Sequence, residues 1–474
     1  MVGRPLRWRP RLGGRDATAL PMPLTSTTSP SPSTGIGPSG RRATRVLWVH
    51  PQRVSMSLAS RLMVVGRDDD CDTVLAGTEL SRRHAEFRVD GPLVAVRDLA
   101  SRNGVFVNGA RINDAPLLAG DVIRCGEWVG VVVSEPAEAP AFAEITPGWW
   151  GGAKLAAAVQ PLRQIQGELP VIVQGETGTG KEGTAHAIHL WSGRKGPFVA
   201  LNCAALPAEL AEAELFGYRK GAFTGANQTS PGLFRAAEGG TLFLDEILEL
   251  AAPLQAKLLR VLEDRRVRAL GETRDVPVDV RVVAATQEPL ADAVALRRFR
   301  ADLHARLDGL TVVLPPLRDR REDVAPLFLE LLRAHTGGRP PAVEPKLVEA
   351  LCLYDWPLNV RELALLARRL LSLNGHESVL RKSHLPERMI VRVAAEGDGA
   401  AGEASGPVEQ AAATGDKRVR RATDDQSEFE ALIEALRRAD GSVGKAAALV
   451  GISRARAYRL IAAHPDFSLE DIRQ

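Results

Sequence analysis

The stretch Leu169–Lys181, LPVIVQGETGTGK, decides the fold of the middle of this 474-residue chain. Its first half is a short apolar run, typical of a strand in a parallel sheet that is covered on both faces. The second half is a glycine-rich loop that opens a predicted helix. Its backbone N–H groups and the helix N-terminus can hold a triphosphate, and Lys181 can reach the β and γ phosphates. We predict a nucleotide site formed by Gly175, Glu176, Thr177, Gly178, Thr179, Gly180, Lys181 and Glu182, with Glu182 standing where Ser or Thr is common.

A second apolar run ends on two carboxylates, in Leu242-Phe-Leu-Asp245-Glu246. Asp245 can hold Mg²⁺ through water, and Glu246 can polarise the attacking water, so we expect ATP and Mg²⁺ as cofactors. Two carboxylates are expensive to bury without a cation, which weakens a purely structural role. Further apolar runs alternate with amphipathic helical patterns and predict an α/β fold; they are FVALN, VRVVAAT and TVVLP.

The region 45–134 has a different texture, with short strands broken by Gly, Asp and Asn. This texture predicts an all-β sandwich. Four short motifs follow one another in it: Gly66-Arg67, Ser81-Arg-Arg-His84, Ser101-Arg-Asn-Gly104 and Asn108-Gly109. Arg67 can make a charge-assisted contact to phosphate, and Ser81 with nearby amides can add neutral donors.

In this order the four motifs resemble the forkhead-associated (FHA) domain. The resemblance implies a phosphothreonine site, and His84 and Gly104 are then expected to be structural. The alternative is a sandwich used only for packing. The residues implied for phosphothreonine binding are Arg67, Ser81, Arg82, Arg102 and Asn103.

Between the two motifs of the ATPase region lies Glu214-Leu-Phe-Gly-Tyr-Arg-Lys-Gly-Ala-Phe-Thr-Gly-Ala226. A loop that exposes Phe223 among small residues is a poor choice unless it meets a partner. The stretch resembles the signature loop of sigma-54-dependent transcriptional activators, which implies contact with sigma-54. LNCAAL, GGTLFLDE, QAKLLRVLE and LPPLRDRREDV also match that family. The implied sigma-54 contact consists of Gly221, Ala222, Phe223, Thr224, Gly225 and Ala226.

The same resemblance implies further roles in the ATPase. Asn202 is the switch that couples Glu246 to the γ-phosphate, and Arg361 is a second nucleotide sensor. Arg300 and Arg306 are arginine fingers offered to a neighbouring subunit, so a homo-oligomeric ring is implied, which in the family is a hexamer. Three positions depart from the family pattern: Leu248 and Leu358 stand where the family usually has Gly, and Gln287 stands where it usually has the sensor Asn.

The C-terminal segment reads as a small helical unit. Apolar spacing at Phe429, Leu432, Ile433 and Leu436 predicts a helix with one buried stripe. The segment resembles the Fis-type helix-turn-helix, whose recognition helix can reach phosphates and guanine edges. The alternative is a three-helix packing module. The implied DNA-binding residues are Ser453, Arg454, Arg456, Tyr458 and Arg459.

Bulk composition bounds these interpretations. The net charge is only +3, so any DNA contact must be local. Four widely spaced cysteines argue against zinc and disulfides, and no apolar run is long enough for a membrane span, so we expect a cytoplasmic protein. The predicted order is tail 1–44, FHA domain 45–134, linker 135–147, AAA+ ATPase 148–385 with a helical lid at about 318–385, linker 386–427 and helix-turn-helix 428–474.

The resemblance as a whole predicts a multidomain regulator. It would couple ATP hydrolysis to open-complex formation by sigma-54 RNA polymerase holoenzyme, acting from upstream promoter DNA. Its FHA domain would recognise a phosphothreonine-containing protein or kinase. Two rivals are a DNA-bound phosphopeptide scaffold with an impaired ATPase and a general AAA+ remodelling chaperone.

Overall fold

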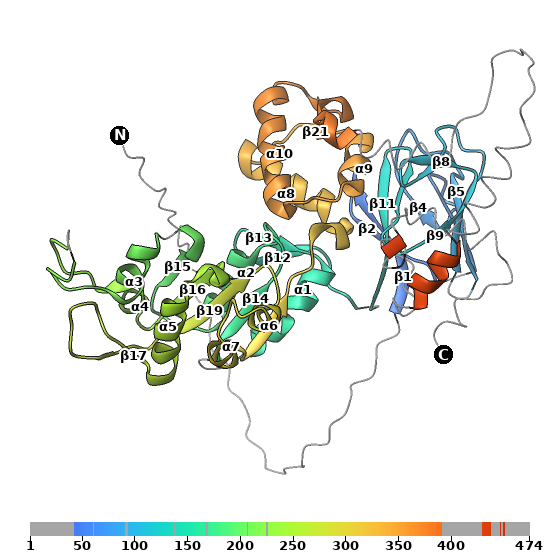
Figure 1. Cartoon of the computed structure of the whole chain (residues 1–474). Helices are drawn as coiled ribbons and strands as arrows, with labels where there is room; N and C mark the ends of the chain where they lie inside the picture. The colour runs from blue at the N-terminus through green and yellow to red at the C-terminus, as the bar shows by residue number, and fades with distance from the viewer. Residues whose placement is uncertain are drawn as a thin grey trace, which may run out of the picture. The chain divides into compact units, whose positions relative to one another are not determined.

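The computed structural model describes residues 42–390 except 60, 91–92, 137, 166–168, 206 and 224–225, together with 429–437, 446 and 449–450. Figure 1 shows the β-rich N-terminal part, the α/β part and the helical lid. Each forms the class of structure that the sequence predicts. Within the described residues, no helix is both long enough and apolar enough to cross a bilayer.

The N-terminal part is a sandwich of two sheets. One has the order β2-β1-β11-β10-β7-β8 and the other β4-β3-β5-β6-β9. Asn108 and Gly109 both have positive φ, which suits the tight turn between β7 and β8. The strands are β1 (Arg42–His50), β2 (Val54–Ser57), β3 (Leu62–Gly66), β4 (Thr73–Val74), β5 (Ala85–Asp90), β6 (Leu93–Asp98), β7 (Val105–Val107), β8 (Ala110–Ile112), β9 (Asp114–Leu117), β10 (Val122–Cys125) and β11 (Trp128–Pro136).

The α/β part is built on a parallel sheet of five strands in the order β15-β16-β19-β14-β20. Each predicted apolar run forms one of these strands, because a strand covered on both faces needs apolar residues throughout. The register sets Asn202 beside Asp245 at the carboxyl edge. The strands are β14 (Val171–Gln174), β15 (Phe198–Asn202), β16 (Thr241–Asp245), β19 (Arg281–Thr286) and β20 (Leu310–Val313).

Helices cover this sheet and connect its strands (Figure 1). Helix α2 follows the glycine-rich loop and packs on β14 and β16. Helices α5 and α7 pack against each other on the side that also holds α3 and α4. The helices of this part are α1 (Ala153–Val159), α2 (Lys181–Trp191), α3 (Ala208–Phe216), α4 (Gly232–Ala236), α5 (Ala252–Asp264), α6 (Leu290–Ala295) and α7 (Ala301–Leu307), with β17 (Arg266–Val267) and β18 (Val276–Pro277) as a small hairpin.

The lid follows β20 and is helical. It contains α8 (Val324–Thr336), α9 (Pro345–Leu353) and α10 (Asn359–Asn374). Short 3₁₀ turns precede α8 and follow α10, and β21 (Ala342–Val343), between α8 and α9, pairs with β22 (Val379–Leu380) after α10. Trp356 is fully buried at the turn between α9 and α10, and its indole N–H donates to Leu351 O at 2.9 Å.

One segment and one residue differ from the expectation. The region predicted as linker, 135–147, contains the end of β11 and strand β12 (Ala143–Thr146), which pairs with β13 (Trp149–Gly151). The sequence lacks the periodicity by which so short a hairpin could be recognised. In the C-terminal segment residues 429–437 are helical, with Phe429, Leu432 and Leu436 buried as predicted and Ile433 only partly buried.

Candidate functional site

The glycine-rich loop forms a backbone cradle between β14 and α2. Gly178 and Gly180 have φ of +77° and +110°, a region that glycine enters without steric cost. A Cβ at Gly178 would lie 2.2 Å from Leu358 O, so a larger residue would push the loop away from the lid. Lys181 is buried and donates to the carbonyls of Gly175 at 2.8 Å and Glu176 at 3.3 Å. The loop therefore presents one buried ammonium within a ring of backbone groups.

Asp245 and Glu246 stand at the carboxyl end of β16, close enough to Lys181 to affect its titration. Burial lowers the pKa of Lys181, while the charges of both carboxylates oppose that shift. Burial likewise raises the pKa of Asp245, opposed first by Lys181. Glu246 has a φ of +54°, uncommon for a residue with a side chain. Such backbone strain persists where the surroundings hold it, and it is concentrated at functional sites.

These residues fit a magnesium nucleotide. The described residues contain no group of three His, Cys, Asp or Glu side chains that could hold a metal ion on their own. Mg²⁺ commonly takes one or two carboxylates and completes its shell with phosphates and water. Lys181 and Asp245 both carry a burial penalty on their charge, which an anionic phosphate and a cation would offset.

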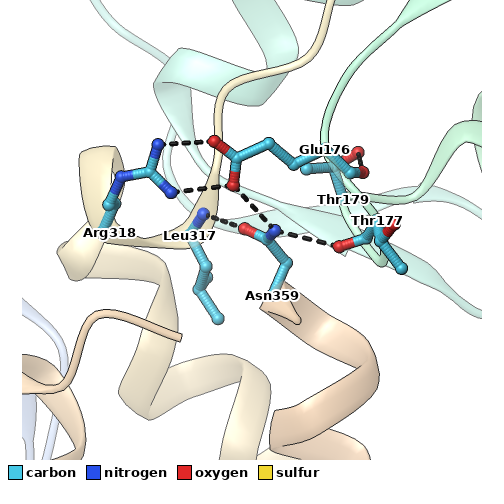
Figure 2. Close-up of polar contacts among 6 residues, drawn as sticks. All are labelled: Glu176, Thr177, Thr179, Leu317, Arg318 and Asn359. Atoms are coloured by element: carbon cyan, nitrogen blue, oxygen red, sulfur yellow. Dashed lines mark hydrogen bonds and ion pairs between the residues drawn. The ribbon is translucent and has the colours of Figure 1, made fainter. Parts of the chain in front are cut away.

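A polar cluster joins the glycine-rich loop to the lid (Figure 2). The Glu176 carboxylate accepts two hydrogen bonds from Arg318, at 2.7 and 2.5 Å, and one from Asn359 Nδ2 at 3.2 Å. Arg318 is the largest cause that lowers the pKa of Glu176. Asn359 also donates to Thr177 O at 3.0 Å and accepts from Leu317 N at 2.7 Å. The cluster ties the loop to two separate segments of the lid. Sequence reasoning placed Glu176 at the nucleotide but missed Arg318 and Asn359, which stand more than 130 positions away.

A cavity of about 210 Å³ opens beside the loop, with Thr179 and Gly180 in its wall. Trp149 and Trp150 of β13 and Val360 of the lid also line it. The Trp149 indole packs against the start of α2, since a Cβ at Gly180 would lie 3.1 Å from Trp149 Nε1. A mostly apolar pocket next to a phosphate cradle suits a flat base. The Trp149-Trp150 pair in the sequence was the one signal that could have pointed to it.

The other predicted ATPase residues are distributed over three places. Asn202 lies at the end of β15, and its side chain accepts from Ala204 N at 2.9 Å. The positive charge of Arg361, at the start of α10, acts to lower the pKa of both Lys181 and Asp245. Arg300 immediately precedes α7 and pairs with Asp302, whereas Arg306 lies on α7 and donates to Leu262 O at 3.0 Å. Neither arginine is among the groups that shift the pKa of Lys181 or Asp245.

The three departures from the family pattern are accommodated by the backbone. Leu248 and Leu358 are not among the positive-φ residues, so neither position requires glycine. Leu248 is instead partly buried against the core of the α/β part. Gln287 follows β19, and its Nε2 donates to Glu246 Oε1 at 3.4 Å. The amide at this position therefore reaches the carboxylate predicted to polarise water.

The loop from Gly221 to Ala226 lies in the connection between α3 and α4, which are labelled in Figure 1. Its ends are joined by a hydrogen bond from Gly221 N to Ala226 O at 2.9 Å. Phe223 is only partly exposed, because its ring packs edge-on against Tyr218 with centroids 5.1 Å apart, and Ala226 is buried. Phe223 is therefore less exposed than the sequence predicted. Thr224 and Gly225 lie outside the described residues.

The FHA motifs come together on three loops of the sandwich. Ser81 Oγ accepts from Arg102 N at 3.0 Å, and Asn103 Nδ2 donates to Glu79 O at 2.7 Å. The fully buried His84 accepts from Ser81 N at Nδ1, so Nε2 must carry the proton that it shares with Gly104 O at 3.2 Å. Burial lowers the pKa of His84, which agrees with this neutral tautomer. Arg67, Arg82, Arg102 and Asn103 remain exposed.

The predicted DNA-binding residues, Ser453, Arg454, Arg456, Tyr458 and Arg459, lie outside the described residues.

Comparison with known protein families gives four matches along the chain. Residues 63–126 match the FHA domain, 153–313 the Sigma-54 interaction domain, 318–401 an AAA+ ATPase lid domain and 425–457 the Fis family of bacterial regulatory proteins. The order agrees with the architecture that the sequence predicts.

Relatives with curated descriptions support the same assignment. The chain is 49% identical over 204 residues to the pathogenicity locus probable regulatory protein HrpS of Pseudomonas syringae pv. syringae, covering 42% of this chain and 68% of that protein. It is 41% identical over 319 residues to the transcriptional regulatory protein XylR of Pseudomonas putida, covering 65% of this chain and 55% of that protein. Over four of its curated relatives the match spans between 34% and 55% of the relative's length.

Among solved structures, the crystal structure of NtrX from Brucella abortus in complex with ADP is 29% identical to the chain, with a TM-score of 0.49. The match covers 66% of this chain and 69% of that one. From the family matches and the extensive identity to HrpS, the chain belongs to the sigma-54-dependent transcriptional activators, with an FHA domain, an AAA+ ATPase domain with its lid, and a Fis-type helix-turn-helix.

Proposed function

We propose that this chain couples ATP hydrolysis to open-complex formation by sigma-54 RNA polymerase, under the control of phosphothreonine recognition by its FHA domain. The observation that carries the proposal is that Lys181, at the start of α2, lies close enough to Asp245 and Glu246, at the end of β16, for both carboxylates to act on its pKa. The Gly221–Ala226 loop belongs to a separate insertion of the same domain.

In the proposed reaction each group at the sheet edge has one task. The glycine-rich loop orients the phosphates, and Lys181 offsets their charge as the terminal phosphoryl group is transferred. When bound, Mg²⁺ supplies a positive charge that neutralises the β and γ oxygens, and Asp245 would hold it through water. Glu246 polarises the attacking water, and its strained backbone together with the Gln287 amide fixes the direction of its carboxylate. Asn202, next to Asp245 in the sheet, would couple Glu246 to the γ-phosphate.

The nucleotide base is proposed to occupy the cavity beside Trp149. The Asn359 and Arg318 contacts hold the lid against the phosphate loop, and Arg361 extends a further charge toward the same site. Binding would therefore bring together residues of β13, the loop and the lid.

The arginines of α7 are proposed to act on a neighbouring subunit. Arg300 is bound to Asp302 of α7 and Arg306 to a carbonyl of α5, and neither is among the groups that shift the pKa of Lys181 or Asp245. An arginine that stabilises transition-state charge must reach the phosphates, so a homo-oligomeric ring is required, and we propose a hexamer.

The FHA residues are proposed to hold a phosphothreonine of a partner protein or kinase. Ser81 and His84 fix the three loops to one another, which leaves the exposed Arg67 and Arg102 free to meet a phosphate. The C-terminal unit would bind upstream promoter DNA through Ser453, Arg454, Arg456, Tyr458 and Arg459.

The deciding experiment separates hydrolysis from output. Thr224→Ala should leave ring assembly and ATPase rate within a few-fold of wild type, because its hydroxyl is not part of the phosphate chemistry. Open-complex formation by sigma-54 polymerase should collapse. An ATPase assay is paired with transcription from a sigma-54 promoter, with Thr336→Ala on the lid helix α8 as the control substitution. Normal transcription by Thr224→Ala would mean that this loop is not the sigma-54 contact.

The phosphothreonine part has its own test. Arg67→Ala should weaken binding of a phosphothreonine peptide about tenfold to a hundredfold, the ~1.5–3 kcal/mol of a charge-assisted contact. Calorimetry gives the affinity, and Arg97→Ala, an exposed arginine of β6, is the control. If wild-type protein binds phosphorylated and unphosphorylated peptides equally, the FHA domain is a packing module.

A scaffold with an impaired ATPase is the second candidate, favoured by the departures at Leu248 and Gln287. The backbone accommodates both, and Gln287 still reaches Glu246. A turnover rate at the level of Glu246→Gln would favour the scaffold.

A further inference from the structure

The strands β10 and β11 of the FHA sandwich are buried on both faces. An antiparallel sheet with one solvated face alternates apolar and polar residues. In β11, the run from Trp128 to Val133 is buried without interruption, and all four residues of β10 are buried. A second layer must therefore cover the outer face of this sheet.

The covering layer is the ATPase lid. Along β11 the side chains alternate between two cores: Trp128 and Val132 belong to the core of the sandwich, whereas Val129, Val131 and Val133 belong to the core of the lid. The lid helix α9 is likewise buried on all sides, because every residue from Leu347 to Leu353 is buried. A helix buried all round needs partners on opposite sides.

Polar contacts fix the position of the two surfaces. Arg124 Nε of β10 donates to Glu349 Oε2 of α9 at 2.8 Å, and the two side chains are only 9% and 8% exposed. The Arg124 guanidinium also stacks on the Phe106 ring, 3.8 Å from its centroid. Arg321 of the lid donates to Gly120 O of the sandwich at 3.3 Å. A buried ion pair defines a register that apolar contact alone would leave loose.

From this interface a continuous set of contacts leads to the nucleotide loop. Trp356 lies three residues after the end of α9, and its indole N–H donates to Leu351 O in that helix. Asn359, three residues on, holds Glu176 and Thr177 of the loop. Buried residues of the lid therefore connect α9, which contacts the FHA sheet, to the phosphate cradle.

We propose that the outer face of the FHA sheet is a docking surface for α9, held by the Arg124–Glu349 pair, and that the FHA domain and the lid move as one body. None of the phosphothreonine residues is among these docking contacts, and Arg67, Arg82, Arg102 and Asn103 stay exposed. Whatever moves the lid relative to the glycine-rich loop therefore carries the phosphothreonine site with it. Conversely, a protein bound to the FHA domain acts on the lid. This coupling rests on the proposed nucleotide function, but the docking itself does not.

The test is hydrogen exchange on the full chain, read over β10–β11 and over α9. Glu349→Gln leaves Arg124 buried without its counter-charge, so amides of both segments should exchange at least about tenfold faster. The double variant Arg124→Met/Glu349→Leu replaces the pair by apolar residues of similar size and should bring protection back. Arg97→Met, an exposed arginine on the other sheet, should change nothing. Exchange in β16 and β19 serves as the internal reference for an intact ATPase core.

Faster exchange confined to α9, with β10–β11 unchanged, would overturn the docking. If Glu349→Gln also exposes β16 and β19, the double variant decides: protected β10–β11 and α9 support the docking, and continued rapid exchange overturns it.

A second measurement adds a non-hydrolysable ATP analogue with Mg²⁺. Protection of β10–β11 should change at least twofold in wild type and not in Lys181→Ala. An analogue that binds wild type but leaves β10–β11 unchanged would refute the coupling. No binding at all would refute the nucleotide proposal, while the Glu349→Gln result would still stand for the docking.

Discussion

Asn359 is the single side chain whose loss should do most to separate the lid from the phosphate loop. It is fully buried and makes three hydrogen bonds: it accepts from Leu317 N and donates to Glu176 and to Thr177 O (Figure 2). Asn359→Ala removes all three and leaves the Leu317 N–H without its acceptor. An unsatisfied buried donor costs roughly 1–3 kcal/mol, and each lost bond about 0.5–1.5 kcal/mol, or more when one partner is charged.

Water entering the gap recovers part of this sum, so we expect a net loss of about 3 kcal/mol in the lid–loop contact. At about 1.4 kcal/mol per tenfold change, opening of the contact becomes roughly a hundredfold more frequent. Hydrogen exchange over Gly175–Lys181 in nucleotide-free protein measures this opening directly. Titration with a fluorescent ADP analogue should show weaker binding in parallel. Arg369→Ala, an exposed residue on the same helix, is the matched control.

The backbone at Asn359 supplies a separate check. Its φ is +51°, a region that costs Ala about 1–2 kcal/mol but costs glycine nothing. Asn359→Gly should therefore be milder than Asn359→Ala and still clearly weakened. If Asn359→Gly protects the loop as well as wild type, the side-chain hydrogen bonds contribute nothing and the magnitude given above is refuted.

Two further predictions concern turnover. Glu246→Gln should abolish hydrolysis and retain nucleotide binding, because the amide cannot polarise water as the carboxylate does; steady-state phosphate release at the wild-type rate would contradict the assignment. Arg306→Ala subunits should be inactive alone yet recover turnover when mixed with Lys181→Ala subunits, since each supplies what the other lacks in a shared interface. Mixed rings without recovered activity, in the same phosphate-release assay, would argue against hydrolysis in trans.

The sequence by itself determined the local elements and the chemistry that each carries. Continuous apolar runs formed the parallel strands, because strands covered on both faces have no solvent side on which to place polar residues. The loop ending in Lys181 and the carboxylates Asp245 and Glu246 were predicted as a nucleotide site because these residue types at a strand end suit phosphate and magnesium chemistry. His84 was correctly expected to be structural, and its burial and two hydrogen bonds give the reason.

Only the tertiary structure decided which distant residues meet. Glu176 reaches Arg318 and Asn359 because the lid folds back over the loop, and such contacts leave no periodic trace in the sequence. The backbone also decided that Leu358 is tolerated where the family has glycine, since φ there is −106°. The sequence of β11 contains a continuous apolar run, but the sequence does not say which element covers its second face. A continuous apolar run indicates that both faces of a strand are buried, whereas the tertiary structure decides that the lid covers the outer face of β11.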